Sequence, residues 1–451
     1  MIKRIVSIIL SIVLVATLFA GCDSTTGSDS TTGSNAGTST AAPQKDVTLT
    51  IWQTSADTYQ SRMDMQANFQ KDNPNIKLNI VETPQGTGAS LVTAIAAGNA
   101  PSVIIAGYPS VAMYAYQNAI LPIDDYMAQT PDFANFDKAQ VDTFLINGKH
   151  YAIPGGMYVM TWSYNKKLFA EAGITAPPTT RDEFLADAKL LTVPSKQQYG
   201  FGLLASVWGC WHFMNWVWGE GGDLTKENAD GTLTLTFTDP AAIKAAEFYR
   251  TLRKEKVIQS DISKDYGALQ KDFALGKSGM FFGASVPQLV SMGGKAEDFG
   301  WFVFPKGPSG KAYSQSGGDV HCIVYTEDKD VADAAWKYKM YECSKEQLEL
   351  TYKEQVSKGN FDATQIPPRT DIKPSDYGQS DPEQKAAVDA SRLIARPEFY
   401  GKGAVAQYAD DMVAAIFGDT TTDIKTVFQA TQDKAAKDVE TFDKGVLEGK
   451  K

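Results

Sequence analysis

The chain has 451 residues and a formal net charge of −10 at pH 7, with 43% hydrophobic and 21% charged residues. This length is too great for one ordinary core, and the composition is that of a folded soluble protein with two or three domains. The acidic balance argues against nucleic acid as a partner and against long-range attraction of anionic ligands, and it leaves neutral ligands open.

The first 22 residues have the pattern of an export signal. Lys3 and Arg4 form a basic start, residues 5–20 are almost wholly apolar, and Ala20-Gly21-Cys22 closes the run. This arrangement predicts a signal peptide over residues 1–21. A transmembrane anchor is the alternative, because the apolar run is near the lower length limit of a membrane span.

The residues before Cys22 resemble the lipobox of bacterial lipoproteins, although Phe19 stands where an aliphatic residue is usual. The resemblance implies that Cys22 carries lipid and anchors the chain to the outer face of the cell membrane. Residues 22–45 are rich in Ser, Thr and Gly, which predicts a flexible tether.

Beyond Cys22 the chain has three cysteines, Cys210, Cys322 and Cys343. They form no CxxC pair, and an odd number leaves at least one unpaired, so a disulfide framework is not expected. We predict three buried thiols that pack as small apolar side chains.

The first folded segment alternates strand and helix. Residues 47–51 and 76–80 alternate apolar and polar side chains, which predicts two strands. The helix predicted between them ends by Pro74 and carries two apolar rows, Met65 with Phe69 and Met63 with Ala67. Strand, helix and strand form a right-handed unit of a partly parallel sheet, and residues 103–105 predict a further strand buried on both faces. This lobe is therefore α/β.

In open α/β sheets, ligands bind beyond the carboxyl ends of the strands. Side chains able to hydrogen-bond or stack on a ligand follow the predicted strands there, namely Gln53, Ser55, Asp57 and Tyr108. The loop 83–87 is predicted at the same edge. The alternative is that these polar residues only cap the helices that follow.

Residues 148–164 predict a turn, a short strand, a break and a second strand, and residues 164–169 contain a helix start. Pro154 restricts one backbone angle, while Gly155 and Gly156 free the next two. The chain can therefore leave one lobe and enter another here, and we interpret this stretch as the first hinge.

The second lobe begins with clear helix signals. Thr180-Arg181-Asp182-Glu183 is a capping box, and Asp239-Pro240 predicts a helix with proline at its first position. Between them, residues 207–218 hold four of the chain's eight tryptophans.

At the angular step of a helix, the tryptophan-rich run places one narrow face over Trp208, Trp211, Asn215 and Trp218. One interpretation is a face buried in the core. The other is that Trp208 and Trp211, at the open end, line a cleft in which an indole stacks on the apolar face of a sugar ring.

Two later segments are interpreted as further crossings between the lobes. The polar stretch 314–319 precedes an apolar run and a helix from Val331, and Ile366-Pro367-Pro368-Arg369 is the third crossing. The closing helices, including residues 404–417, are expected to return to the second lobe. The predicted limits are 46–155 and 320–367 for lobe 1, and 156–319 and 368–451 for lobe 2.

Several of these segments resemble the bacterial extracellular solute-binding proteins of family 1, the maltose-binding-protein-like lipoprotein subunits of sugar-importing ABC transporters. The most specific marks are Gly148-Lys149 with Tyr151 and Pro154, then Tyr164-Asn165-Lys166 with Ala172-Gly173-Ile174. The opening of the family is matched by Phe69, Pro74 and Ile76, then by Ala97-Gly98 and Pro101. The chain departs from the family pattern at Ser102, Arg181 and Ala284-Ser285, where relatives have Asp, Trp and an aromatic residue.

The resemblance implies the type II fold of periplasmic binding proteins, with two α/β lobes, three hinge crossings and a ligand cleft between the lobes. It implies a monomer that captures a neutral solute, expected to be a sugar or oligosaccharide, and delivers it to the membrane subunits of an ABC permease. It favours the two cleft-side indoles for stacking. The expected ligand-binding residues are Gln53, Ser55, Asp57, Tyr108, Tyr158, Trp208, Trp211, Ser285, Asp319 and Arg369.

No catalytic motif stands out, because GxSxG, HExxH and complete P-loop or dinucleotide-binding sequences are missing. The three histidines give no metal-ligand spacing, and His321 and Cys322 would point to opposite sides of a strand. We therefore expect no enzyme activity, cofactor or metal ion. Paired carboxylates escape a motif search, so a secreted glycosidase or lyase anchored as a lipoprotein is the alternative, and a structural lipoprotein is a third class.

Overall fold

The computed structural model describes residues 45–53, 59–82, 91, 94–95, 97–358, 365–377, 381–418 and 421–448. The predicted signal peptide, Cys22 and the tether up to residue 44 lie outside these ranges, as do Ser55, Asp57 and the loop 83–87. Within the described ranges, no helix is both long and apolar enough to cross a membrane.

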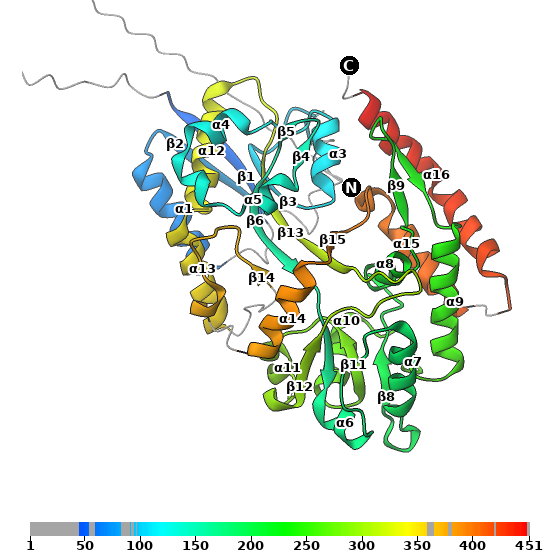
Figure 1. Ribbon diagram of the computed structural model, residues 1–451. Helices are drawn as coiled ribbons and strands as arrows, with labels where there is room; N and C mark the ends of the chain where they lie inside the picture. Colours follow the sequence, from blue (N-terminus) through cyan, green and yellow to red (C-terminus); the bar gives the residue numbers. More distant parts are fainter. Residues whose placement is uncertain are drawn as a thin grey trace, which may run out of the picture. The chain divides into compact units, whose positions relative to one another are not determined.

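The first lobe is built on a seven-stranded sheet with the order β14-β6-β13-β3-β1-β2, in which β15 also pairs with β13 (Figure 1). The strands are β1 Val47–Gln53, β2 Ile76–Glu82, β3 Val103–Gly107, β6 Ile153–Val159, β13 Ser314–Ile323, β14 Gln365–Ile366 and β15 Ala395–Pro397. Strand β1 is parallel to β2 and β3, whereas β13 is antiparallel to β3 and β6, so the sheet is mixed.

The predicted strand–helix–strand unit is confirmed by β1, helix α1 and β2, with Val47 opposite Ile76 in the parallel pair. Helix α1 buries Met65 and Phe69, but Met63 is 46% exposed. Of the two predicted apolar rows, the row of Met65 and Phe69 is buried and the row of Met63 and Ala67 is exposed. Residues two apart on a helix differ by about 200°, so a surface helix that buries one row turns the other toward solvent.

Helices cover both faces of this sheet. They are α1 Gln60–Asp72, α3 Ser110–Tyr116, α4 Asp124–Gln129, α5 Lys138–Asp142, α12 Lys329–Glu342 and α13 Lys345–Ser357, with 3₁₀ turns η2 Pro131–Asn135 and η5 Pro374–Tyr377 and the hairpin β4 Leu145–Ile146 and β5 Lys149–His150. Strands β3 and β13 send alternate side chains into two cores. Val103 and Ile323 pack in the core under α1 and α12, whereas Ile104 and Cys322 pack in the core under α3.

The second lobe contains a four-stranded sheet with the order β12-β7-β11-β8. Its strands are β7 Trp162–Asn165, β8 Tyr199–Gly202, β11 Ser278–Phe282 and β12 Phe299–Phe302, and a separate hairpin is formed by β9 Thr225–Glu227 and β10 Leu233–Leu235. Its helices are α6 Lys166–Glu171, α7 Arg181–Leu190, α8 Gly209–Gly219, α9 Pro240–Lys254, α10 Tyr266–Ala274, α11 Val286–Ser291, α14 Pro382–Arg392, α15 Lys402–Gly418 and α16 Ile424–Glu448, with 3₁₀ turns η3 Pro194–Lys196 and η4 Ala296–Asp298.

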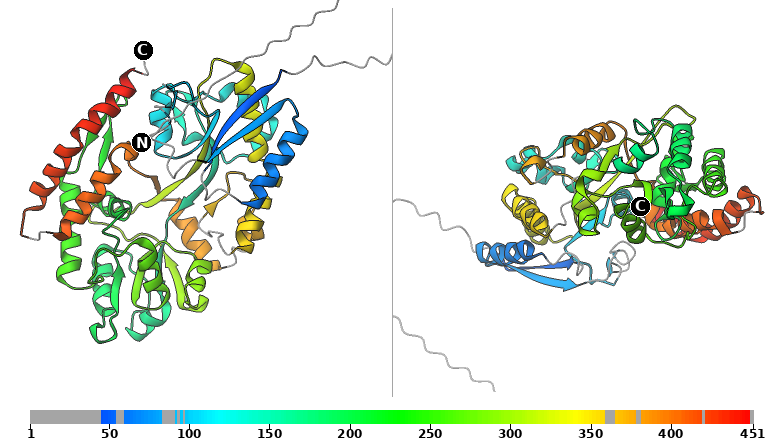
Figure 2. Two further views of the ribbon diagram at one scale, coloured as in Figure 1. Left: turned by 180° about the vertical axis from the view of Figure 1, so that it is seen from behind. Right: turned by 90° about the horizontal axis from the view of Figure 1, so that it is seen from below.

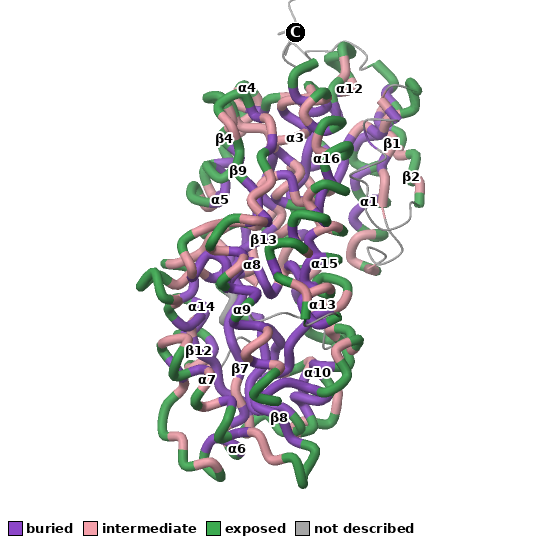
Figure 3. Tube along the Cα trace, turned by 90° about the vertical axis from the view of Figure 1, so that its right-hand side faces the viewer, coloured by how far each residue is buried: buried purple, intermediate pink, exposed green. Residues whose placement is uncertain are grey.

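Helices α15 and α16 lie side by side, and α15 also contacts α8 and α9 (Figure 2). The closing helices therefore pack against helices α8 and α9. Helix α8 is buried along almost its whole length, as Figure 3 shows. Trp162 and Trp216 belong to the large aromatic core between this helix and the four-stranded sheet.

Local signals in the sequence are well reproduced. Thr180 and Glu183 form the predicted capping box of α7, and Pro240 occupies the first turn of α9. The three cysteines of the described ranges are unpaired and buried, as predicted: Cys210, Cys322 and Cys343.

The chain passes between the two sheets after β6, before β13 and after β14, so the predicted crossings exist but two of them differ in form. Pro154, Gly155 and Gly156 do not end the strand, because all three lie inside β6; Pro154 pairs with Val320 and Gly156 with Asp319 of β13, and the register shifts at Gly155 between them. The polar stretch 314–319 is the first half of the ten-residue strand β13. Its polar side chains can be buried because they are hydrogen-bonded. Gln315, for example, is 0% exposed and its side-chain amide donates to Glu398.

After the third crossing, Glu383 attaches helix α14 to the four-stranded sheet. Its carboxylate accepts hydrogen bonds from the Tyr164 hydroxyl at 2.9 Å and from the Trp301 backbone N–H at 3.3 Å. This contact places the segment that follows within reach of the second lobe.

Candidate functional site

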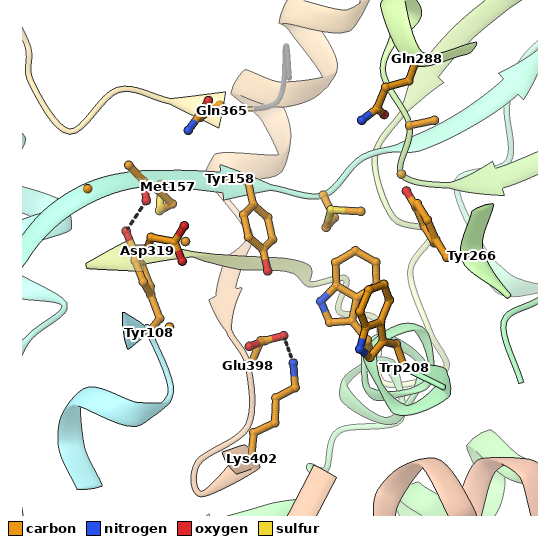
Figure 4. Close-up of a pocket in the computed structure, with 18 residues that line it drawn as sticks. Tyr108, Met157, Tyr158, Trp208, Tyr266, Gln288, Asp319, Gln365, Glu398 and Lys402 are labelled. Atoms are coloured by element: carbon orange, nitrogen blue, oxygen red, sulfur yellow. Dashed lines mark hydrogen bonds and ion pairs between the residues drawn. The ribbon is translucent and has the colours of Figure 1, made fainter. Parts of the chain in front are cut away.

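A cleft of about 580 Å³ lies between the two lobes. One wall comes from β6, β13 and the ends of β3 and β14 in the larger sheet. The opposite wall is formed by Trp208, Trp211, Tyr266, Gln288, Glu398 and Lys402. Figure 4 shows Tyr158 between these two groups, with Tyr108 and Asp319 on one side and Trp208 on the other.

The wall of the cleft that β6 and β13 form depends on glycines in these two strands. A Cβ atom on Gly318 would lie 2.1 Å from the carbonyl oxygen of Gly156, and one on Gly155 would lie 2.8 Å from the carbonyl oxygen of Asp319. No side chain fits in either place. The two backbones can therefore approach closely, and the space above them stays open for a ligand.

Tyr108 shapes the wall at the carboxyl end of β3, where a ligand-binding residue was predicted. Its ring packs edge-on against Phe144 with the centroids 4.8 Å apart, and its hydroxyl donates to the Gly156 carbonyl at 3.3 Å. Burial, followed by the nearby charge of Asp319, raises the pKa of Tyr108 well above its usual range. The hydroxyl is therefore neutral, and its hydrogen bond to Gly156 holds β6 in place.

The tryptophan-rich helix divides between cleft and core. Trp208 is 59% exposed and Trp211 is half-buried, and both line the cleft. Further along α8, Trp218 is 0% exposed and lies under the guanidinium of Arg396 at 4.8 Å. The core interpretation therefore holds for Trp218, whereas Trp208 and Trp211 line the cleft, and their stacking on a sugar ring stays a prediction.

Polar groups line the cleft beside the indoles. The Glu398 carboxylate is paired with the Lys402 ammonium and accepts a hydrogen bond from Gln315 at 3.1 Å. Gln288 accepts a hydrogen bond from Gln270 at 3.0 Å through its carbonyl oxygen, so its amide N–H groups are the part left for the cleft. The cleft lining thus holds oriented acceptors and donors beside an aromatic surface.

The ionisable groups of the cleft have a small negative balance. Two carboxylates, Asp319 and Glu398, line it together with one ammonium, Lys402. His212, directly behind Trp211, adds no charge, because burial lowers its pKa to about 3. This balance disfavours an anionic ligand.

Five of the predicted site residues are brought together in the cleft: Tyr108, Tyr158, Trp208, Trp211 and Asp319. Three others are placed elsewhere. The Gln53 side chain accepts a hydrogen bond from Gln66 at 3.1 Å in lobe 1, and Ser285 is fully buried behind Ala284 at the start of α11.

Arg369 is also directed away from the cleft. It is 3% exposed, and its guanidinium makes paired hydrogen bonds to Asp132 at 2.7 and 2.8 Å and to Asp371 at 2.9 and 3.0 Å. These contacts join the third crossing to lobe 1. A guanidinium already held by two carboxylates has few donors left for a solute.

Several cleft residues were missed by the sequence reasoning: Tyr266, Gln288, Gln365, Glu398 and Lys402. Gln288 lies three positions after Ser285, so the segment was found but not the residue. Glu398 and Lys402 are one helical turn apart, a spacing that signals an ion pair without showing where the pair lies.

Among the described residues, no group of three or more His, Cys, Asp or Glu side chains is placed to hold a metal ion. The chemistry of the cleft is that of hydrogen bonding and aromatic contact. Its lining is suited to recognise an uncharged molecule that has both hydroxyl groups and an apolar face.

Residues 52–339 match the family of the bacterial extracellular solute-binding protein. A binding protein of Brucella abortus is 28% identical over 308 residues, which cover 66% of this chain and 72% of that protein. The diacetylchitobiose binding protein of Streptomyces coelicolor is 29% identical over 271 residues, or 58% of this chain and 61% of that protein.

Solved structures share the fold. An ABC substrate-binding protein of Listeria monocytogenes, in complex with cycloalternan, superposes with a TM-score of 0.68 at 20% identity and covers 87% of this chain and 99% of its own. The GacH receptor of Streptomyces glaucescens, solved unliganded and with acarbose, gives 0.67 at 21% identity, covering 88% and 99%. The predicted two-lobed type II fold is confirmed, and since the family match spans more than half of the sequence, this chain is a member of the bacterial extracellular solute-binding proteins.

Proposed function

We propose that this protein captures a neutral carbohydrate or polyol in the cleft between its lobes and delivers it to the permease of an ABC importer. The observation that carries the proposal is the composition of the cleft, in which the indoles of Trp208 and Trp211 lie beside oriented polar groups. The family is extracellular by its description, so the chain acts outside the cytoplasm.

The aromatic wall supports a ligand with an apolar face. Trp208 is mostly exposed and lines the cleft, and the rings of Trp211 and Tyr266, which also line it, have centroids 6.0 Å apart. A pyranose ring has axial C–H groups on one face and hydroxyls around its edge. Stacking would remove apolar surface of both partners from water, while the edge hydroxyls meet Glu398, Gln288 and Asp319.

Relatives and structural neighbours bind molecules of this kind, according to their names. They include binders of diacetylchitobiose, maltodextrin, D-mannitol and ribitol. The surplus negative charge of the cleft favours uncharged ligands such as these over anionic ones. The cleft of a two-lobed protein changes volume when the lobes move, so the proposal covers ligands from polyols to oligosaccharides.

We also propose that the lobes close on the ligand by bending at the three crossings. The boundaries between the lobes are then residues 155, 319 and 367. The protein is proposed to work as a monomer. Gly155 and Gly317 lie in neighbouring strands that both pass from the larger sheet toward the second lobe. Closure is favoured when both walls contact one solute, since the ligand then binds the closed state more tightly than the open one.

A thermal-shift panel tests the proposal. The purified protein is heated with diacetylchitobiose, maltose, acarbose, tagatose, ribitol or mannitol, and with glucose beside glucose 6-phosphate as a control pair that shares the sugar ring and differs in charge. A ligand at 100 times its Kd should stabilise the protein by about 2.7 kcal/mol, which raises Tm measurably. Stabilisation by an anionic sugar and by no neutral one would contradict the proposal.

The same panel addresses the enzyme alternative. Asp319 and Glu398 are both carboxylates of the cleft, so each stabilising sugar is also incubated with the protein and analysed for cleavage products. We expect binding without turnover. Catalytic release of shorter sugars would establish a glycosidase or lyase instead.

We further propose that residues 1–21 are removed and that Cys22 is lipidated, which would anchor the binding protein near its permease. This proposal is based on the apolar run that ends in Ala20-Gly21-Cys22. Changing Cys22 to Ala should leave the chain unprocessed or release it from membranes. A Cys22→Ala protein that stays with the membranes at the normal mature mass would contradict this proposal.

A further inference from the structure

The backbone of Trp208, the exposed indole of the cleft, has a conformation that non-glycine residues rarely adopt. Its φ is 68° and its ψ is 16°, in the left-handed region. Cβ crowds the backbone there, so such a residue persists only where its surroundings hold it. Trp208 is also the residue that precedes helix α8, and its carbonyl accepts the N–H of Trp211 at 3.0 Å.

The surroundings that hold Trp208 are the two oxygens of one carboxylate. Oδ2 of Asp410 accepts the backbone N–H of Trp208 at 2.9 Å, and Oδ1 accepts the backbone N–H of Cys210, also at 2.9 Å. Asp410 belongs to α15 and is only 8% exposed. A negative charge at the start of a helix is favoured by the unpaired N–H groups and by the helix dipole.

Close packing fixes the position of this carboxylate. Helix α15 lies against the start of α8, where a Cβ on Gly209 would come within 3.1 Å of the Val413 side chain. Val413 is one turn from Asp410 on α15, so the same face supplies both the apolar contact and the carboxylate. Asp410 is therefore held in place from a segment more than 200 positions away in the sequence from Trp208.

We propose that Asp410 is a positioning residue for ligand recognition: its carboxylate holds Trp208 in the left-handed conformation that presents the indole to the cleft. Without it, the 207–209 backbone would relax to ordinary angles and the indole would change direction. Asp410 is not among the residues that line the cleft. The inference rests on the proposed function for its consequence, but the geometry of Trp208 can be tested without any ligand.

The test uses the full mature chain labelled with 5-fluorotryptophan and observed by ¹⁹F NMR without ligand. The chain has eight tryptophans, and the resonance of Trp208 is identified by its loss in Trp208→Phe. Asp410→Asn keeps the shape of the side chain but can accept only one of the two N–H groups. We expect it to shift or broaden the Trp208 resonance while the signal of Trp162, which is 1% exposed in the core, stays unchanged.

Asp411→Asn is the matched control. Asp411 is the next residue of α15, it is exposed, and it accepts a hydrogen bond from Gln407 on the same helix at 2.9 Å. This variant should leave the Trp208 resonance where it is in the parent. An unchanged Trp208 resonance in Asp410→Asn would overturn the proposal, and so would an equal change in Asp411→Asn.

A binding cycle tests the consequence with the panel carbohydrate that raises Tm most. Asp410→Asn should weaken its binding about fivefold, the factor that corresponds to one lost N-terminal cap. In a Trp208→Ala background the same change should leave Kd unaltered, because no indole remains to be positioned. Equal losses in both backgrounds would mean that Asp410 acts on structure alone. If no carbohydrate binds, the proposed function fails while the resonance still decides the role of Asp410.

Discussion

Removing the indole of Trp208 should separate binding from stability. Trp208 is 59% exposed and lines the cleft, so most of its surface contacts solvent and not the core. Trp208→Ala should therefore lower the free energy of unfolding by only about 1 kcal/mol, as for a partly exposed side chain. Its effect on ligand affinity should be larger.

The expected loss of affinity follows from the exposed area. A tryptophan side chain has up to about 250 Å² of surface, so this exposure leaves about 150 Å² open to a ligand. A sugar ring stacked on one face would cover about half of it, roughly 70 Å². At about 25 cal/mol per Å², that burial contributes about 2 kcal/mol, or roughly 30-fold in Kd.

The assay is isothermal titration of the parent and Trp208→Ala with the carbohydrate found in the thermal-shift panel, beside melting curves. Trp218→Ala is the control, since this indole is 0% exposed and its loss should cost about 3–5 kcal/mol of stability. The reasoning is refuted if Trp208→Ala binds as tightly as the parent. It is equally refuted if Trp208→Ala melts as early as Trp218→Ala.

Three further results are expected. Arg369→Met should lower the free energy of unfolding by about 2 kcal/mol, because it leaves the partly exposed carboxylates of Asp132 and Asp371 unpaired, and it should leave Kd unchanged by titration. Burial alone would raise the pKa of Glu342, but Lys339 and other nearby cations hold it well below the usual value of 4.5. The stability that this carboxylate contributes is therefore present above about pH 4.5 and is lost as the pH falls. Denaturant unfolding at several pH values should therefore show a weaker acid loss in Glu342→Gln. Small-angle scattering should show a smaller radius of gyration with saturating carbohydrate, if the lobes close on it.

Each of these has a contradicting outcome. An Arg369→Met protein with parental stability but weaker binding would restore Arg369 to the ligand site. Parallel pH curves for Glu342→Gln and the parent would show that this buried network does not govern acid stability. An unchanged radius of gyration with a ligand of proven affinity would argue against hinge closure.

The sequence by itself determined the class of fold and the family. Alternation in residues 47–51 and 76–80, the capping box at Thr180 and the proline start at Pro240 are signals whose cause is local, namely side-chain periodicity and the unpaired N–H groups of helix starts. They needed no partner elsewhere in the chain. The motifs around Gly148 and Tyr164 then placed the chain in its family before any contact was known.

Tertiary structure decided which residues meet in the cleft. Glu398 and Lys402 come from beyond the third crossing, and no local pattern shows that they line the cleft together with Trp208. Arg369 had the chemistry of a ligand residue, but it is held by Asp132, 237 positions earlier. Pro154, Gly155 and Gly156 predicted a break between two strands, yet pairing with β13 keeps this segment within one strand, β6. A sequence pattern indicates whether a side chain is buried or exposed. The contacts that decide its role come from segments that only folding brings together.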